Sequence, residues 1–454
     1  MSALGQFAGR LAGIRSRGVP EPALERARLC LLDTLGCGLH GSTLEEGRAL
    51  VAGLARLGGG DAPAWGGGPP LGRGDRALAC GALAHLRELD DVHWSITHPG
   101  AVVVPAVLAL ARGREIALGD VLAAVAAGYE AMVRVSLASG FLAHRQKGWH
   151  ATATMGPFGA AAACGVLLEL DTRAMTWALG LAGSRTGGTW AFKADGAMSK
   201  RLHPGLAARD GLTAACLAAE GITGPEFVLE AEDGGFFRVA CEGWDLDLLD
   251  RDWGRAWAVA EVEFKWYAAC KSVHAPLEAG LNLHRRRPAA EVEAVRVGIN
   301  SSAMAMAGSM YRRDSVASAQ LSIPYGLALG LSGRPGTAAD FEPAAIQDEE
   351  LFRLAGKVRV EVSPEMERLR LEHHKSAARV EVLYWDGSRD AEEVQDPKGH
   401  LGHPLTAREI EDKFRGLAQG ALGAVRAEAL CATIVHGPAG TPVRELFTCL
   451  EKEG

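Results

Sequence analysis

Apolar residues recur at a helical period through the first half of the chain. Residues 20–39 carry Leu24, Ala27 and Leu31 at intervals of three and four, which predicts an amphipathic helix. The same period, or a continuous run of small apolar residues, predicts further helices at residues 76–89, 101–111, 118–137, 156–165, 174–184 and 205–221. Residues 58–74 are rich in glycine and proline and are expected to form a loop.

The pattern changes near residue 256. Segments with alternating apolar positions, typical of half-buried strands, follow at residues 258–264, 292–299, 357–362 and 378–384. Helical patterns lie between them, at residues 316–331 and 344–356. From Thr406 the chain becomes helical again, because Thr406 and Glu409 have the spacing of a capping box.

These patterns predict a mainly α protein with two domains. An all-helical domain is expected from residues 1–262 and 401–454, so that both ends of the chain belong to it. Residues 263–400 are expected to form a smaller α+β domain inserted between them. A chain of 454 residues is long enough for this division.

Composition narrows the classes of partner. The hydrophobic fraction of 48% and the charged fraction of 23% are ordinary for a globular protein. The net charge of −7 provides no general basic face, so we expect no nucleic-acid partner. The nine cysteines are scattered and contain no C-x-x-C, which favours free thiols in a reducing compartment. We find neither a signal-peptide pattern nor an apolar run of membrane-span length, and expect a cytoplasmic protein without a membrane partner.

A basic cluster is the first candidate site. Lys200, Arg201 and His203 lie within four positions, directly before Pro204 and Gly205, which are expected to open a helix. The free N–H groups and partial positive charge at a helix N-terminus favour an anion, so the cluster predicts a carboxylate or phosphate site. A solvated basic loop is the alternative, and the spacing alone favours neither.

Other junctions between loops and predicted helices also carry titratable groups. They are Asp90 and Asp91 with His98, then His150, and finally Lys265 with Tyr267, Cys270 and His274. The structural alternatives are a helix-capping role for the aspartates, a satisfied polar position for His150 and a core position for Tyr267. No histidine pair has H-E-x-x-H spacing, and there is no P-loop and no G-x-S-x-G, so we expect no metal site.

Taken together, these stretches resemble the MmgE/PrpD family, which includes 2-methylcitrate dehydratases, cis-aconitate decarboxylases and iminodisuccinate epimerases. One matching motif is Lys200-Arg201-x-His203-x-Gly205. The matching segments follow the family order over nearly the whole chain, at residues 90–100, 148–152, 200–208, 221–225, 230–237, 265–274, 320–325 and 396–414.

The resemblance implies a large all-helical domain, a smaller α+β lid, and a homodimer without metal or organic cofactor. It also implies an enzyme that handles a proton on carbon next to a carboxylate, in a small di- or tricarboxylate substrate. By position, the expected catalytic residues are His98, His150, Lys200 and Lys265. The expected substrate-binding residues are Glu88, Asp91, Arg201, His203, Tyr267, Cys270 and His274.

The chain departs from the decarboxylases of this family at two polar positions. Val92 stands where they have a threonine, and Cys270 where they have a further histidine, which counts against cis-aconitate itself as the substrate. The segment at residues 264–274 is closer to the epimerase-like members. We therefore expect a lyase, either dehydratase or decarboxylase. An epimerase is the alternative, and a carboxylate binder without turnover is the second alternative.

The expected mechanism is acid–base catalysis in a positive field. Like charges nearby are expected to lower the pKa of Lys200 so that it exchanges protons near neutrality. Glu88 and Asp91 are expected to orient the histidines. The sequence leaves open which of the histidines and Lys200 is the acid and which is the base.

Overall fold

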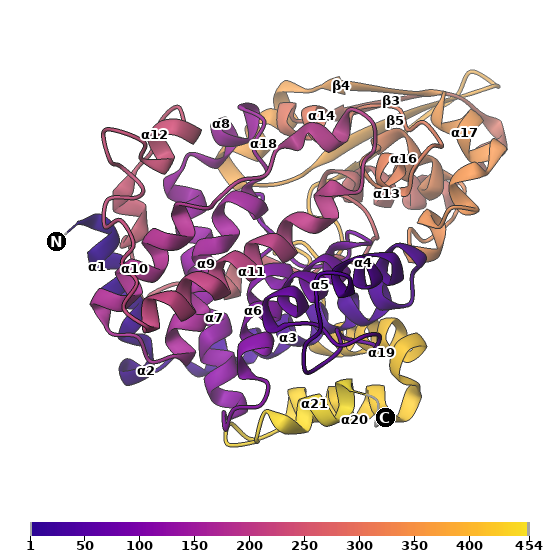
Figure 1. Ribbon diagram of the computed structural model, residues 1–454. Coiled ribbons are helices and arrows are strands. Elements are labelled where there is room, and N and C mark those ends of the chain that lie inside the picture. The colour runs from indigo at the N-terminus through magenta and orange to yellow at the C-terminus, as the bar shows by residue number, and fades with distance from the viewer. Residues whose placement is uncertain (1, 452–454) are drawn as a thin grey trace.

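The computed structural model in Figure 1 describes residues 2–451. Its first half is helical, as the apolar period predicts, and residues 58–72 form the expected loop. The helices of this part are α1 (Ala3–Ala12), α2 (Ile14–Arg17), α3 (Glu21–Ser42), α4 (Glu45–Ala55), α5 (Arg73–His85), α6 (Gly100–Ala111), α7 (Leu118–Ala138), α8 (Phe141–Gln146), α9 (Ala151–Leu167), α10 (Thr172–Gly183), α11 (Ser199–Ala219) and α12 (Phe236–Ala240).

Two of the helix boundaries that differ from the prediction lie at the candidate site. Helix α5 ends at His85 instead of residue 89, because Glu88 adopts a left-handed backbone with φ of 54°. Helix α11 begins at Ser199 instead of residue 205, so Pro204 lies inside it. Lys200 and Arg201 are therefore in the first turn of a helix and not in a preceding loop.

Small residues let the central helices approach closely. Helix α11 packs against α5, α9 and α6, and α7 packs against α9. A Cβ atom at Gly205 would lie 2.1 Å from the carbonyl oxygen of Leu78 in α5, so only glycine allows this crossing. The close contact between α5 and α11 places the start of α11 beside the end of α5.

Helix α7 corrects one expectation from the sequence. It is long and apolar enough to cross a membrane by length and composition, which we did not expect of any segment. However, 89% of its most apolar window is buried inside the protein. Glu130 and Arg134, which pair with each other, also lie within it. These features are those of a core helix that other helices surround.

A four-stranded mixed sheet forms the other part of the molecule. Its order is β4-β3-β5-β6, with β3 parallel to β4 and antiparallel to β5, and β5 antiparallel to β6. The strands are β3 (Val292–Ile299), β4 (Val358–Val362), β5 (Ala378–Tyr384) and β6 (Arg389–Val394). The first three match the alternating segments. The fourth, with the sequence RDAEEV, has too few apolar positions to be recognised.

The alternating segment at residues 258–264 is not a long strand, so that prediction was wrong. It forms a 3-10 helix, η3 (Ala258–Glu261), followed by the short strand β2 (Val262–Glu263), which pairs with β1 (Val92–His93). The backbone N–H of Ala258 donates to the Glu130 side chain of α7 at 2.7 Å. The backbone of this segment therefore bonds to a helix, and not to a neighbouring strand as a β-strand would.

The helices of this part cover the sheet and extend beyond it (Figure 1). The predicted helix at residues 316–331 is interrupted, because the Ser322 side chain caps a new helix there. The helices are α13 (Lys271–His284), α14 (Ser301–Ala307), α15 (Val316–Gln320), α16 (Ile323–Leu331), α17 (Glu349–Ala355) and α18 (Pro364–His373). Helix α13 packs against α16 and against strands β5 and β6.

The chain ends in three helices, α19 (Ala407–Leu422), α20 (Ala424–His436) and α21 (Arg444–Leu450). The predicted capping box is confirmed, since Thr406 accepts from the N–H of Glu409 and the Glu409 side chain accepts from that of Thr406. Helix α19 packs against α3, near the other end of the sequence. The predicted class, mainly α with an α+β part, is confirmed. The proposed boundaries at residues 263 and 400 stay a prediction.

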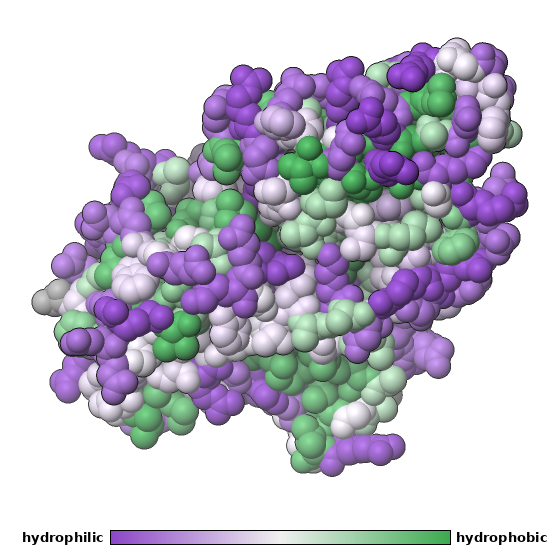
Figure 2. All heavy atoms as spheres, turned by 90° about the horizontal axis from the view of Figure 1, so that it is seen from above, coloured by the Kyte–Doolittle hydropathy of each residue, from purple (hydrophilic) through white to green (hydrophobic). Residues whose placement is uncertain are grey.

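The surface and the cysteines add two observations. The face in Figure 2 is mostly hydrophilic, with hydrophobic patches across it that reach its lower edge. All nine cysteines are free, six of them buried. The free thiols agree with the prediction from the scattered spacing of the cysteines.

Candidate active site

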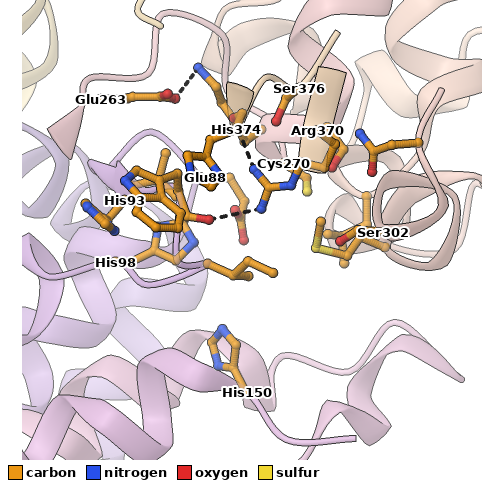
Figure 3. A pocket seen from close by; sticks show the side chains of 18 of the residues that line it. Glu88, His93, His98, His150, Glu263, Cys270, Ser302, Arg370, His374 and Ser376 are labelled. Atoms are coloured by element: carbon orange, nitrogen blue, oxygen red, sulfur yellow. Dashed lines mark hydrogen bonds and ion pairs between the residues drawn. The ribbon is translucent and has the colours of Figure 1, made fainter. Parts of the chain in front are cut away.

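A polar pocket lies where the helical part meets the α+β part. It encloses about 700 Å³ of empty space, including its mouth. Figure 3 shows Glu88, His93 and His98 on one side of it, Arg370, Ser302 and Ser376 on the other, and His150 apart from both. Of the residues expected from the sequence, those that line the pocket are Glu88, His98, His150, Lys200 and Cys270.

Glu88 is the centre of a buried charge cluster. Lys200 and Arg201 both contact its Oε1, and Lys265 Nζ lies 3.1 Å from its Oε2. All four side chains are buried, and Lys200 is only 2% exposed, so the alternative of a solvated basic loop does not hold. Burial raises the pKa of Glu88, but Lys200 and Lys265 outweigh this effect and hold it well below its usual range.

Lys200 is linked to His85, which was not expected from the sequence, and through His85 to Asp90. Its Nζ donates to His85 Nε2 at 2.7 Å, and His85 Nδ1 lies 2.8 Å from Asp90 Oδ2. His85 is fully buried, which lowers its pKa to about 3, so it stays neutral and donates through Nδ1. A sequence signal existed, since His85 precedes Glu88 by three positions within the helix predicted at residues 76–89.

Asp90 holds His98 in one tautomer. His98 Nδ1 lies 2.9 Å from the backbone oxygen of Asp91 and 3.3 Å from Asp90 Oδ2. Both neighbours are acceptors, so the Nδ1 atom carries the hydrogen and Nε2 of the neutral ring keeps a lone pair. Burial lowers the pKa of His98, which favours this neutral form. His98 is therefore a proton acceptor at the pocket wall.

Asp91 has a structural role in this arrangement. Its Oδ1 accepts from the N–H of Gly100 at 2.9 Å, in the first turn of α6, and its Oδ2 accepts from the hydroxyl of Tyr129. Burial raises its pKa to about 7. The side chain that faces His98 is that of Asp90, whereas Asp91 contributes its backbone oxygen.

His150 and His203 form an imidazole pair. Their Nδ1 atoms lie 2.9 Å apart, so one of the two must donate to the other. Burial lowers the pKa of His203 to about 4 and that of His150 well below its usual range, with Lys200 adding to both effects. His150 lines the pocket, whereas His203 is not part of the lining and contacts His150. The expected role of His203 in substrate binding stays a prediction.

Tyr267 and His274 lie outside the pocket lining. The Tyr267 hydroxyl donates to Glu278 Oε2 at 3.0 Å, and His274 Nε2 lies 3.2 Å from the backbone oxygen of Ala269. Their rings meet edge to face. In this structure both support the segment that carries Lys265 and Cys270.

The α+β part supplies a second polar wall. Lys271 Nζ lies 2.5 Å from Glu263 Oε2, and Arg370 projects from α18. Neutral groups complete this wall. They are Cys270, Ser272, Asn300, Ser302, His374 and Ser376. Arg370 could not be recognised from the sequence, because α18 is a charged helix that resembles an exposed one.

One group of side chains has the composition of a metal site. Donor atoms of His85, Glu88 and His98 lie within 4.8 Å of one another. Lys200 Nζ already contacts two of these residues, at His85 Nε2 and Glu88 Oε1. An ammonium group therefore occupies the position that a metal ion would need, and a cation there would be repelled by it.

The electrostatics of the pocket favour an anion. Three cations share the single carboxylate of Glu88, and Asp90 adds a second negative charge beside them, so one positive charge is left over. Burial lowers the pKa of Lys200, and Arg201 and Lys265 add to this, whereas Glu88 opposes it. The site thus combines surplus positive charge, a neutral imidazole acceptor and a lysine donor in a partly enclosed space.

Comparison with known proteins identifies the family. Residues 5–249 match the MmgE/PrpD N-terminal domain, and residues 267–435 match the MmgE/PrpD C-terminal domain. The chain belongs to the MmgE/PrpD family.

The similar proteins are enzymes of one type. A cis-aconitate decarboxylase of Aspergillus terreus is 29% identical over 95% of this chain and 93% of its own. A second from Aspergillus terreus is 30% identical over 88% of this chain and 86% of its own. The human cis-aconitate decarboxylase is 26% identical over 91% and 87%. These relatives support an enzyme of the lyase type.

Proposed function

We propose that this protein is a lyase that acts on a small di- or tricarboxylate without a metal or organic cofactor. The observation that carries the proposal is the meeting of His98, His150 and Lys200 at one pocket, although they are far apart in the sequence. The named activity of the relatives favours decarboxylation over dehydration. As the family resemblance implies, we also propose that the chain acts as a homodimer.

The proposed chemistry uses two groups. The cations around Glu88 stabilise the negative charge that develops when a carbon–carboxylate bond breaks. The bonding electrons stay on carbon, carbon dioxide leaves, and the ammonium of Lys200 delivers the proton that carbon then needs. In a dehydration, His98 Nε2 would remove the proton from carbon, and the hydroxyl would leave as water with a proton from Lys200.

An epimerase is the second candidate, and Cys270 favours it. The thiol of Cys270 lines the pocket together with His98, at a position where the decarboxylases of the family have a histidine. Inversion at carbon needs one group that removes a proton and a second that returns it from the other face. Proton NMR in deuterated water separates the candidates, because epimerisation exchanges the hydrogen and retains the carbon skeleton, whereas a lyase releases a carboxyl group or forms an alkene.

Replacing Lys200 tests the proposal. We expect Lys200→Met to lower kcat/KM by at least about a thousandfold on whichever polycarboxylate the unaltered protein converts, because the donor and part of the positive field are lost. Lys147→Met is the matched control, since Lys147 is exposed. Activity is measured by release of carbon dioxide and by NMR across citrate-like acids. Near-normal turnover by Lys200→Met would refute the assignment. Tight binding of these acids by the unaltered protein, without turnover of any of them, would favour a carboxylate binder.

A further inference from the structure

Arg370 is a buried cation without an acidic partner. It is 7% exposed, and its guanidinium donates to two backbone oxygens, those of His374 at 3.2 Å and Trp94 at 3.0 Å. Within residues 2–451 the other five buried arginines, Arg28, Arg76, Arg87, Arg134 and Arg201, each form an ion pair with a carboxylate. Arg370 forms none among these residues.

This isolation is costly unless an anion arrives from outside. A buried charge is normally paired, because its separation from water is unfavourable. Burial lowers the pKa of Arg370, although the guanidinium keeps its charge at any physiological pH. The two carbonyl oxygens fix its position but do not neutralise it. An anion in the pocket would do so, and a planar guanidinium suits a carboxylate.

The neighbours of Arg370 fit the same ligand. Ser302 and Ser376 line the pocket on the same side in Figure 3, and neither hydroxyl bonds to another side chain or backbone group in the described part of the chain. Hydroxyl groups donate readily to carboxylate oxygens. Two acids, Glu263 and Glu367, stabilise the charge of Arg370 from a distance but do not contact it. Glu263 pairs with Lys271 and His400, and Glu367 accepts from Ser301.

We propose that Arg370, with Ser302 and Ser376, binds a carboxylate of the substrate that is remote from the reacting carbon. This inference rests on the proposed function and extends it. The reacting end meets Lys200, His98 and His150 on the helical side, whereas the remote carboxylate meets the α+β side. The enzyme then selects substrates with at least two carboxylates and rejects otherwise similar monocarboxylates.

Binding measurements in an inactive background test the inference. We use calorimetry on Lys200→Met protein with maleate and with isocrotonate, in which a methyl group replaces one carboxylate of maleate. Adding Arg370→Gln is expected to weaken maleate binding on the order of 10- to 100-fold, as for the loss of a charged hydrogen-bonding partner. Isocrotonate binding should change less than about threefold. Arg370→Lys should recover part of the maleate affinity, because it keeps the charge but not the planar fork.

The control is Arg368→Gln, which removes an exposed arginine from the same helix and should leave binding unchanged. Circular dichroism of each variant excludes a loss of fold, and Arg370→Lys serves if Arg370→Gln does not fold.

Undiminished maleate binding in Arg370→Gln would overturn the inference, as would an equal loss for both ligands or no maleate binding at all. Turnover that is insensitive to Arg370→Gln overturns this inference alone. Arg370-dependent maleate binding by a protein that converts no acid would overturn only the proposed function.

Discussion

At the scale of single residues, the adjacent acids Asp90 and Asp91 have different tasks. Asp90 contacts the rings of His85 and His98, whereas Asp91 fixes the start of α6 through Gly100 and is held by Tyr129. Burial would raise the pKa of Asp90, but the donors on the two rings hold it well below its usual range. A permanent negative charge therefore lies behind both imidazoles, and it stabilises either ring if that ring becomes protonated.

Replacing Asp90 should separate these tasks. We expect Asp90→Asn to lower kcat/KM about a hundredfold or more, because the amide can donate to His98 and favour the wrong tautomer. The apparent pKa on the acidic side of the rate profile should also fall, since an imidazolium would lose its counter-charge. The measurement is kcat/KM against pH.

Asp91→Asn is the control, because its neutral amide resembles the protonated carboxyl that a pKa of about 7 makes common. It should lower thermal stability and leave the shape of the pH profile unchanged. If both variants gave the same profile, the orienting role of Asp90 would be disproved.

At the scale of elements, the site depends on how closely α11 crosses α5. Lys200 lies in the first turn of α11, and His85 ends α5, so their contact exists only at this helix separation. Gly205 sets the separation, since a Cβ there would lie 2.1 Å from Leu78 O, a backbone atom that cannot turn aside.

Gly205→Ala should therefore reduce both stability and activity. We expect a loss of about 1–3 kcal/mol in the free energy of unfolding from overpacking. We also expect a fall in kcat larger than the rise in KM, because Lys200 moves away from His85. Gly416→Ala in α19 is the control, since its Cβ would meet nothing within 4 Å, and alanine there should stabilise the helix slightly. Urea unfolding and steady-state kinetics measure the two effects, and an unaltered Gly205→Ala protein would contradict the argument.

At the scale of the whole molecule, many histidines are buried in the neutral form. Burial lowers the pKa of seven buried histidines in the described part of the chain, to about 3 for His85 and about 4 for His144 and His203, with His98, His150, His274 and His400 also lowered. Below the unfolded value of about 6.5, the unfolded chain binds protons that the folded protein does not. Stability therefore falls as the pH falls. Three buried carboxyls, those of Asp33, Asp91 and Glu130, act in the opposite direction, because their raised pKa values add stability as the pH falls, but they are three groups against seven histidines.

We expect the melting temperature to drop between pH 7 and pH 5. Each such histidine contributes a slope of about 1.4 kcal/mol per pH unit below its unfolded pKa. Scanning calorimetry at several pH values measures the effect. His144→Gln should give a shallower dependence, whereas His373→Gln, at an exposed position, should not change it. A melting temperature that is constant or rises toward pH 5 would refute the prediction.

The sequence by itself determined the helical first half, three of the four sheet strands and the titratable character of the site. These features are local, because helical and alternating periods depend on residues that are close together in the sequence. The motif around Lys200 and His203 also indicated the family, although the sequence does not show which atoms are in contact.

Only the tertiary structure decided what each of these residues contacts. Glu88 meets Lys200 and Lys265 across 112 and 177 positions of sequence, and Arg370 meets Trp94 across 276. The division of tasks between Asp90 and Asp91 depends on the left-handed turn at Glu88, and the unpaired charge of Arg370 is visible only when its surroundings are known. Burial and partners set the charge and tautomer of a side chain, and both arise from contacts between distant segments that no local pattern encodes.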